Sequence, residues 1–372
     1  MDDKVEDILE DMSQSLEDWV IEKRNDWRDD YEANYKDVFE EYYRLWRAQW
    51  AKEDSQRDSE RSRIISPALQ QAVESNVAEV EEATFGRGKW FDLVDDLADE
   101  ENTDMEILRR QLQKDFDKAK VRKSIGEILI NSAVFGTGVG EIVVEMKAER
   151  RPASRPTEDG GTEGGIEKED RFMVGLRPVL PQNFLMDPVA TDVNEAVGCI
   201  IDEFVPRHTV ELLQESGVYK DTYIEDASVD TDIEPDQQLG IYPDEKIRLV
   251  KYYGLVPTSL LVDAGAEVDE DAGMYTEAIV VLANDGVLLK AIASPYMMQD
   301  RPIVAFPWDV VPGRFWGRGV CEKGYMSQKA LDTEMRARID ALALTVHPMM
   351  AMDISRLPKG TKPKVSSGNT IF

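Results

Sequence analysis

The sequence predicts an α+β protein, and three patterns support that fold class. Up to about residue 146, apolar and aromatic residues recur at three- and four-residue steps, which is typical of amphipathic helices. From about residue 170, short β-branched runs such as "EAVGCIIDEFV" and "KIRLVKYYGLVP" predict strands. One long amphipathic helix is then expected from Lys323 to Val346, because apolar residues return on a single face and Pro348 ends the pattern: Leu331, Met335, Ile339, Leu342 and Val346.

Residues 1–63 predict an acidic helical segment, with 20 acidic and 11 basic residues. Aromatic residues follow one stripe of it: Trp19, Trp27, Tyr31, Tyr35, Phe39, Tyr42, Tyr43, Trp46 and Trp50. Such rings can stack on nucleobases, but their acidic neighbours would repel phosphate. We therefore expect the stripe to dock against the body of the protein or against a neighbouring copy.

The glycines of "INSAVFGTGVGEIVV" raise the question of a phosphate-binding loop. Such a loop follows a strand and opens a helix. Here a helical pattern precedes Gly136, Gly138 and Gly140, and a strand-like run follows them. The order predicts a helix cap and a turn rather than a nucleotide site.

The rest of the chain contains two polar stretches and one hairpin signal. Residues 150–170 are rich in Gly, Pro and Glu and are expected to form a mobile, exposed loop. The stretch around Asp230 resembles a calcium loop, but Pro235 and Ile241 occupy positions where an EF-hand needs Gly and Glu, so a solvated loop is expected. Asn284-Asp285-Gly286 between two apolar runs predicts a hairpin.

Composition argues against several classes of protein. The formal charge of -30 disfavours adhesion to nucleic acid or to anionic membranes. No apolar run approaches the ~20 residues of a membrane span, and the acidic start does not resemble a signal peptide. Cys199 and Cys321 form no metal-ligand pair, and His208 and His347 are expected to be capping or packing residues. We expect no catalytic residue, no cofactor and no metal site.

Several stretches resemble the portal proteins of tailed bacteriophages, especially short-tailed phages. They are the acidic helical start, "FGTGVGEIVVE", "LRPVLPQNFLMDPVA", and "RPIVAFPWDVVPGRFWGRG" leading into a long helix that ends at His347-Pro348. The resemblance covers residues 64 to 372 and consists of packing patterns rather than a chemical signature.

This resemblance implies a portal-like architecture. Its parts would be an acidic helical segment (1–63), a wing-like mixed α/β region (64–240), a strand-rich region including the clip (241–322), a stem helix (323–347) and the start of a second wing part (348–372). Portals of this type continue further, so the resemblance implies that the C-terminal part is missing.

The resemblance also implies a function and partners. The chain would form a homo-dodecameric ring at the portal vertex of the virion, after assembly in the host cytoplasm. Double-stranded DNA would pass through its channel during packaging and ejection. The partners would be the terminase motor, the tail adaptor, and the major capsid and scaffolding proteins, with no membrane.

Basic residues on and after the long helix are the candidates for the DNA channel: Lys323, Lys329, Arg336, Arg338, Lys359, Lys362 and Lys364. Residues 320–364 hold eight basic and five acidic residues, and a second basic stretch lies at 109–123, so basicity alone does not identify the channel. These side chains could also be the solvated face of an amphipathic helix. We expect the apolar face to contact protein, and Arg336 and Asp340 to meet the channel or a neighbouring subunit.

Two other classes remain open. A head-tail adaptor or scaffold would share the acidity and the lack of an active site, although adaptors are shorter and scaffolds are nearly all helix. A nucleotide-binding enzyme would need the glycine stretch as a phosphate loop, which its element order disfavours.

Overall fold

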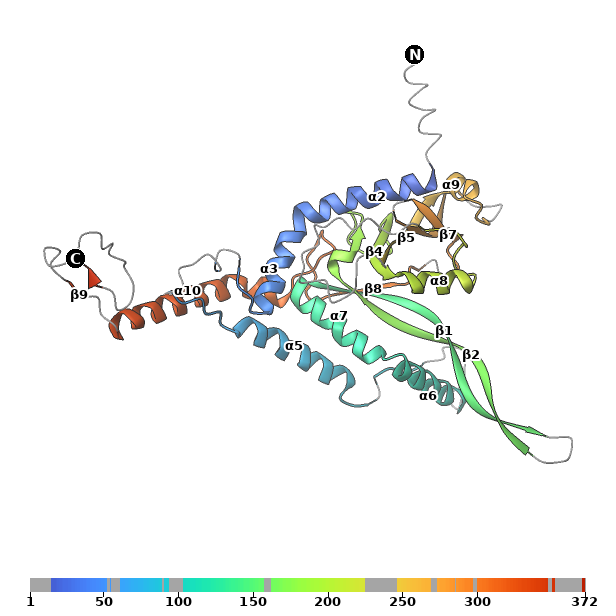
Figure 1. Cartoon of the computed structure of the whole chain (residues 1–372), viewed down its shortest axis with the longest axis horizontal. Coiled ribbons are helices and arrows are strands. Elements are labelled where there is room, and N and C mark those ends of the chain that lie inside the picture. The colour runs from blue at the N-terminus through green and yellow to red at the C-terminus, as the bar shows by residue number, and fades with distance from the viewer. Residues whose placement is uncertain are drawn as a thin grey trace, which may run out of the picture.

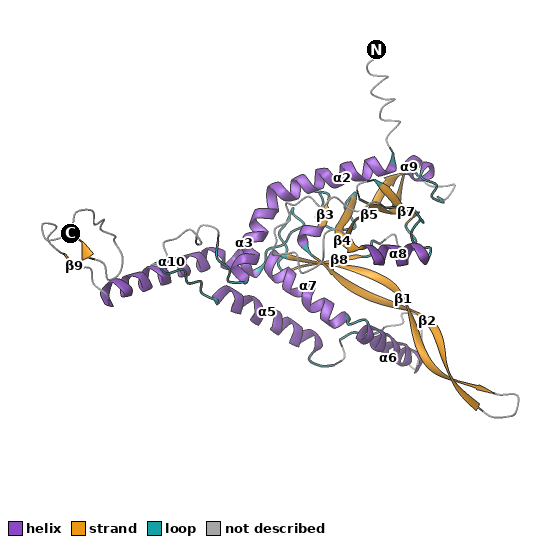
Figure 2. Ribbon diagram, viewed as in Figure 1, coloured by secondary structure: helices purple, strands orange, loops and turns teal. Residues whose placement is uncertain are grey.

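The computed structural model describes residues 15–51, 54, 61–88, 90–93, 103–156, 162–224, 246–268, 273–284, 286–296, 300–346, 350–351 and 370–371. The predicted α+β class is confirmed, because helices accompany antiparallel sheets (Figure 2). The helical elements are α2 (Leu16–Tyr31), the π-helical turn η1 (Glu32–Lys36), α3 (Asp37–Trp46), α5 (Ala68–Phe85), α6 (Thr103–Lys118), α7 (Val121–Phe135), the 3-10 turn η2 (Pro181–Asn183), α8 (Arg207–Glu215), α9 (Thr258–Asp263) and α10 (Val320–Val346).

Within the described residues, the strands form two larger sheets and one short pair. Sheet A has the order β2-β1-β8, sheet B has the order β3-β4-β5-β6-β7, and both are antiparallel, whereas β9 and β10 pair in parallel. The strands are β1 (Thr137–Pro156), β2 (Thr162–Val179), β3 (Phe184–Met186), β4 (Gly198–Pro206), β5 (Lys246–Pro257), β6 (Tyr275–Ala283), β7 (Val287–Ala293), β8 (Ile303–Pro307), β9 (Met350–Ala351) and β10 (Thr370–Ile371). Sheet B thus draws strands from both sides of residue 240, so the expected wing-like and strand-rich regions share one core.

Sheet B is covered on both faces, and this stacking sets the layers of the body (Figure 1). On one face, Trp19 and Trp27 of α2 pack against Tyr252 of β5, with ring centroids 5.4 and 6.1 Å apart. On the other face, the hydroxyl of the next residue, Tyr253, donates a 2.8 Å hydrogen bond to Glu141 of β1 in sheet A. Neighbouring strand residues point to opposite faces, so β5 joins α2 to sheet A through consecutive tyrosines.

Strand β4 repeats this arrangement with two consecutive acids. The Asp202 carboxylate, whose side chain is 2% exposed, accepts hydrogen bonds of 2.7–3.0 Å from three arginines, two of them on α2: Arg24, Arg28 and Arg248. Glu203 points toward sheet A, and its Oε1 lies 2.8 Å from Arg177 of β2 and 3.0 Å from Lys251 of β5. Paired charges therefore fix both neighbours of sheet B.

Most of the aromatic stripe of the N-terminal segment packs against the body, as predicted. Phe39 of α3 meets Phe135 at 5.4 Å and Trp316 at 5.1 Å between ring centroids. Tyr31 and Phe39 are 7% and 6% exposed. Most of the stripe belongs to the main hydrophobic core, whereas Trp46 packs against a second, helical core, and Tyr43 and Trp50 are 43% and 54% exposed.

The glycine stretch forms the corner that its element order predicts. Helix α7 is capped by Gly136, whose φ of 100° suits glycine; the Gly136 N–H donates a 2.9 Å hydrogen bond to the Ser132 carbonyl. Strand β1 follows directly. A Cβ on Gly138 would lie 2.1 Å from the Ile128 carbonyl oxygen, so this glycine allows α7 to contact sheet A closely.

The prediction of a loop over residues 150–170 is wrong for most of that range. Strands β1 and β2 pair continuously out to Pro156 and Thr162, and only residues 157–161 between them lie outside the described residues. The composition misled because a two-stranded ribbon satisfies its backbone groups by pairing across the hairpin. It therefore needs no apolar period, and the absence of one does not exclude strands.

Other local predictions are confirmed. The "NDG" hairpin joins β6 to β7, with Ala283 paired to Val287 and Asn284 at a φ of 44°. The two strands quoted above are β4 and β5. The calcium-like stretch after Asp230 lies outside the described residues.

Candidate functional site

The long helix predicted from Lys323 is α10, which begins three residues earlier, at Val320. Its 27 residues make it about 40 Å long. Its first turns are built into a helical core that includes Cys321, Leu69 and Leu129. Its C-terminal half extends away from the body (Figure 1).

Three glycines set the direction of α10 at its base. A Cβ on Gly317 would lie 2.7 Å from the Gly136 carbonyl oxygen, and a Cβ on Gly319 would lie 2.6 Å from the Ala133 carbonyl oxygen. The Thr137 hydroxyl accepts a 2.8 Å hydrogen bond from the Gly317 N–H. The "FGTG" corner and the "FWGRG" segment thus meet backbone to backbone, which only residues without side chains permit.

One side of α10 is occupied by residues 62–69, which we call the strap; it consists of the irregular stretch 62–66, a turn at residue 67 and the first residues of α5. The Gln328 amide, 3% exposed, accepts a 3.1 Å hydrogen bond from the Leu69 N–H and donates one of 2.7 Å to the Ser66 carbonyl. One turn later, Asp332 Oδ1 accepts a 2.7 Å hydrogen bond from the Ser66 N–H. Polar side chains of α10 thus replace the backbone partners that the irregular stretch and the first turn of α5 lack.

The same pattern continues along the next two turns. The Arg336 guanidinium donates to the Ile64 carbonyl at 2.8 Å and to both oxygens of Asp54 at 2.6 and 3.2 Å. Burial alone would raise the pKa of Asp54, but the hydrogen bonds and charge of Arg336 outweigh it and leave that pKa lowered. The Asp340 carboxylate accepts a 2.7 Å hydrogen bond from the Ser62 N–H. Within this chain, Arg336 and Asp340 therefore meet the N-terminal region.

Lys329 lies on the same side of α10 and contacts α3. Its ammonium lies 2.7 Å from Glu41 Oε1 and 5.0 Å from the ring centre of Tyr325. Hydrogen bonds to Glu41 and Tyr325 raise the pKa of Lys329. Its charge is balanced within the chain.

Two other channel candidates lie on a different, more open side of the helix. Lys323 forms an ion pair with Asp309, and its side chain is 40% exposed. Arg338 forms an ion pair with Glu334, four residues earlier, and its side chain is 73% exposed. The remaining candidates fall outside the described residues: Lys359, Lys362 and Lys364.

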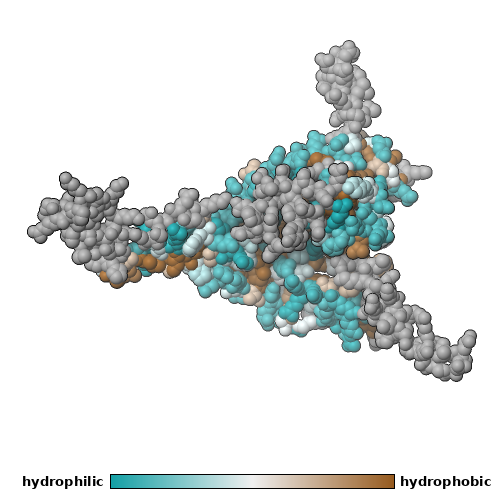
Figure 3. Space-filling model, in the orientation of Figure 1, coloured by the Kyte–Doolittle hydropathy of each residue, from teal (hydrophilic) through white to brown (hydrophobic). Residues whose placement is uncertain are grey.

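The predicted apolar face of α10 is largely uncovered in the single chain. Leu331 and Met335 are half-buried, whereas Ile339, Leu342 and Val346 are 38%, 62% and 68% exposed. This surface is visible as the brown strip along the protruding helix in Figure 3. The expectation that the whole face contacts protein is therefore not met within one chain, where the strap covers a polar side instead.

The strap is the part of the site that sequence analysis missed. Gln328, Asp332, Arg336 and Asp340 follow one another at four-residue intervals and so share one side of the helix, but such a polar row is equally typical of a solvated face. The signal was hidden because the apolar row was the one taken to contact protein.

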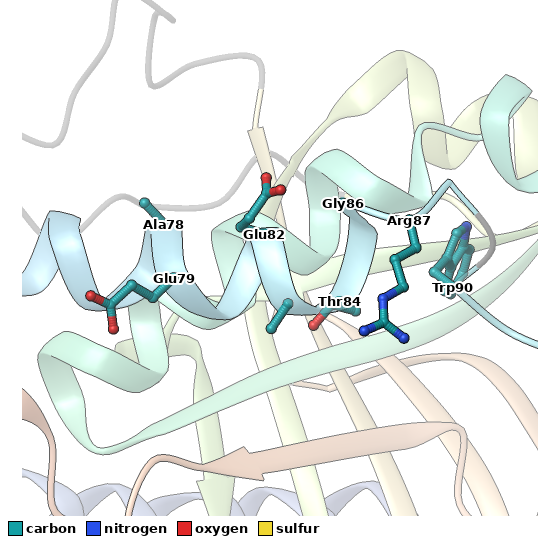
Figure 4. A pocket seen from close by; sticks show the side chains of 8 residues that line it. Ala78, Glu79, Glu82, Thr84, Gly86, Arg87 and Trp90 are labelled. Carbon is teal, nitrogen blue, oxygen red and sulfur yellow. The ribbon is translucent and has the colours of Figure 1, made fainter.

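Other chemistry among the described residues is limited. Burial raises the pKa of the Cys199 and Cys321 thiols to about 12, which leaves them protonated and unreactive. No group of three metal-ligating side chains was found within the described ranges. An open depression at the end of α5 includes Glu79, Glu82 and Arg87, whose charged ends point in different directions (Figure 4).

Comparison with known proteins adds no assignment, because no family model and no curated protein sequence matches this chain. Among the helices of the described residues, none is both long and apolar enough to cross a bilayer.

Proposed function

We propose that the chain is a subunit of a portal ring at the unique vertex of a phage capsid, through which DNA is packaged, retained and ejected and to which the tail attaches. One observation carries this proposal. Helix α10 is held rigidly at its base and on its polar side, yet it presents an apolar row, Ile339, Leu342 and Val346, beyond the body. A solvated helix gains nothing from such a row, but a neighbouring copy in a ring would cover it.

The arrangement of the cations refines the channel part of the proposal. Lys329 and Arg336 are engaged with Glu41 and Asp54, so we assign them to the subunit fold. Lys323 and Arg338 are left as the described candidates for DNA contact, in addition to the three lysines beyond residue 352. Each DNA phosphate that a cation neutralises tightens binding, whereas DNA in a conduit must keep moving. A channel with few cations, each partly neutralised by an acidic neighbour, therefore suits a conduit.

The alternatives fit the architecture less well. A scaffold protein is expected to be nearly all helix, whereas this chain contains two antiparallel sheets. A nucleotide-binding enzyme would need space at the glycines, but Gly136 and Gly138 are in close contact with backbone oxygens of Gly317 and Ile128. A head-tail adaptor remains the second candidate, because it also forms rings.

The proposal is tested by electron microscopy of the purified chain and of two matched variants. We expect closed twelve-fold rings with a central hole from the wild type. Leu342→Glu with Val346→Glu should give monomers with an unchanged circular dichroism spectrum. Met326→Glu changes a methionine that is 76% exposed on the opposite side of α10 and should leave the rings intact. A wild type without rings, or double-variant rings like those of the control, would overturn the proposal.

The conduit role is tested separately by DNA packaging into capsids. Lys323→Glu with Arg338→Glu should preserve the rings and impair filling or retention of DNA. Normal filling and normal ejection would remove both residues from the channel. If capsids fill with DNA without this protein and its rings bind only to finished heads, the protein is a head-tail adaptor instead.

A further inference from the structure

A basic surface lies at the junction of α6 and α7, away from α10. Residues 109–123 hold seven basic and two acidic residues in a chain whose net charge is -30. Six of the cations are exposed, and together they form what we call the basic patch: Arg110, Lys114, Lys118, Lys120, Arg122 and Lys123.

The patch includes a helical stripe with apolar residues at one end. Arg110, Lys114 and Lys118 are spaced four residues apart on α6, and Ile107 lies one turn before Arg110 on the same side. Ile107 is 61% exposed and the adjacent Leu108 is 50% exposed. The surface therefore combines positive charge with uncovered apolar area.

Local acids neutralise only part of this charge. Arg110 and Lys123 form ion pairs with Glu106 and Glu127, on side chains that are themselves 45% and 46% exposed. Such exposed pairs are weak. Lys114 forms no ion pair with the described residues.

The start of α7 adds to the positive potential. Lys120 precedes the helix in a left-handed conformation and makes no side-chain cap, and Arg122 lies in the first turn. Cations at a helix N-terminus oppose the helix dipole, so this arrangement is unfavourable until an anionic partner covers it.

Residues 1–14, "MDDKVEDILEDMSQ", have the complementary composition. They contain six acids and one lysine, which balances the net charge of residues 109–123. Val5, Ile8, Leu9 and Met12 alternate with these acids at three- and four-residue steps. A phosphate backbone would match the charge of the patch but would leave Ile107 and Leu108 exposed, whereas this segment can cover both.

The position of α2 favours a segment from another copy. Helix α2 begins at Leu16 beside α9, on the side of the molecule opposite α6 (Figure 1). We propose that residues 1–14 of one copy bind the basic patch of a neighbouring copy. That a neighbouring copy is present rests on the ring proposed above, whereas the match in charge and apolar residues between this segment and the basic patch does not depend on the ring.

Binding is measured by fluorescence anisotropy with a labelled, acetylated peptide of residues 2–14. The receptor is the full chain with its own segment neutralised by Asp2→Asn, Asp3→Asn, Glu6→Gln, Asp7→Asn, Glu10→Gln and Asp11→Asn. We expect saturable binding that weakens at least tenfold in 0.5 M salt, because exposed charges are screened. Arg110→Glu with Lys114→Glu should also weaken it about tenfold or more, whereas Lys23→Glu with Lys36→Glu on the N-terminal helices should not.

Two controls identify the occupant. A peptide carrying the six neutral substitutions should not bind, and a short DNA duplex should not displace the wild-type peptide. Equal binding of both peptides would overturn the proposal. Binding of the duplex with no binding of the peptide would make the patch a nucleic-acid site and would also overturn it.

Cysteine cross-linking distinguishes a neighbouring copy from the same chain. Ser13→Cys is placed in one chain and Gln111→Cys in another, and the native cysteines are buried. We expect a disulfide-linked pair only in the mixture. If a chain carrying both substitutions forms only an intramolecular disulfide, the proposal that residues 1–14 come from a neighbouring copy is refuted. Intact rings without peptide binding would refute this contact but would leave the proposed portal function standing. Peptide binding without rings would support the contact and overturn the proposed function.

Discussion

The strap makes a quantitative prediction for Gln328→Leu. The substitution keeps the volume of a side chain that is 3% exposed but removes its hydrogen bonds to the Leu69 N–H and the Ser66 carbonyl. Leaving a buried backbone group unpaired costs about 1–3 kcal/mol. Leu69 is 4% exposed and should incur the full cost, whereas Ser66 is only half-buried and should incur less. We expect a net loss of about 2–3 kcal/mol.

The assay combines urea unfolding with amide hydrogen exchange. Exchange should accelerate at Leu69 and spread to the Ser66 and Ser62 amides, because all three donate to α10. Met326→Gln, at a position 76% exposed on the same helix, is the control and should change neither measurement. A loss below about 0.5 kcal/mol with unchanged exchange at Leu69 would refute the assignment of the strap to α10.

Four further predictions test the body and the base of the helix. Asp202→Ala should cost about 3–5 kcal/mol in unfolding free energy, because three arginines lose a buried partner; Asp202→Asn should cost less. Burial alone would raise the pKa of Glu141, but neighbouring cations outweigh it and leave that pKa lowered, so its stabilisation is present above about pH 4.5 and is lost as pH falls through the lowered pKa. Glu141→Gln should therefore flatten the acid limb of a stability–pH curve. Gly317→Ala should cost about 1–3 kcal/mol by overpacking, seen as a lowered melting temperature, and a neutral result would contradict the close backbone contact. Lys329→Glu with Arg336→Glu should lower the unfolding free energy of the isolated chain by about 1–3 kcal/mol in urea, because the new carboxylates would face Glu41 and Asp54. Unchanged stability would contradict their assignment to the fold and make them channel candidates again.

Elements with a strong local signal could be predicted from sequence. Three such signals are local in sequence: the apolar period of α10, the "NDG" turn between β6 and β7, and the helix–glycine–strand order at Gly136. Each depends on backbone preference or on one amphipathic face, so its neighbours along the chain suffice to define it.

Long-range pairing could not be predicted in this way. The partners of Asp202 come from α2 and β5, and Gln328 bonds to residues about 260 positions earlier. With 74 acidic residues in the chain, no single acid stands out as one that will be buried. The part of the β1–β2 hairpin over residues 150–170 was missed for another reason, because cross-strand backbone bonds stabilise it there without an apolar pattern.

Residues from Glu41 to the strap therefore belong to the site, although the resemblance to portal proteins was expected only from about residue 64. Glu41, Asp54 and the strap contact the polar side chains on one side of α10 between Gln328 and Asp340. A second side carries the exposed apolar row, and a third carries Lys323 and Arg338 together with Glu334. In the proposed ring, neighbours would cover the apolar side and leave only the third side open. That side presents few cations, each beside an acid, so the channel surface of this helix would attract DNA weakly and release it readily.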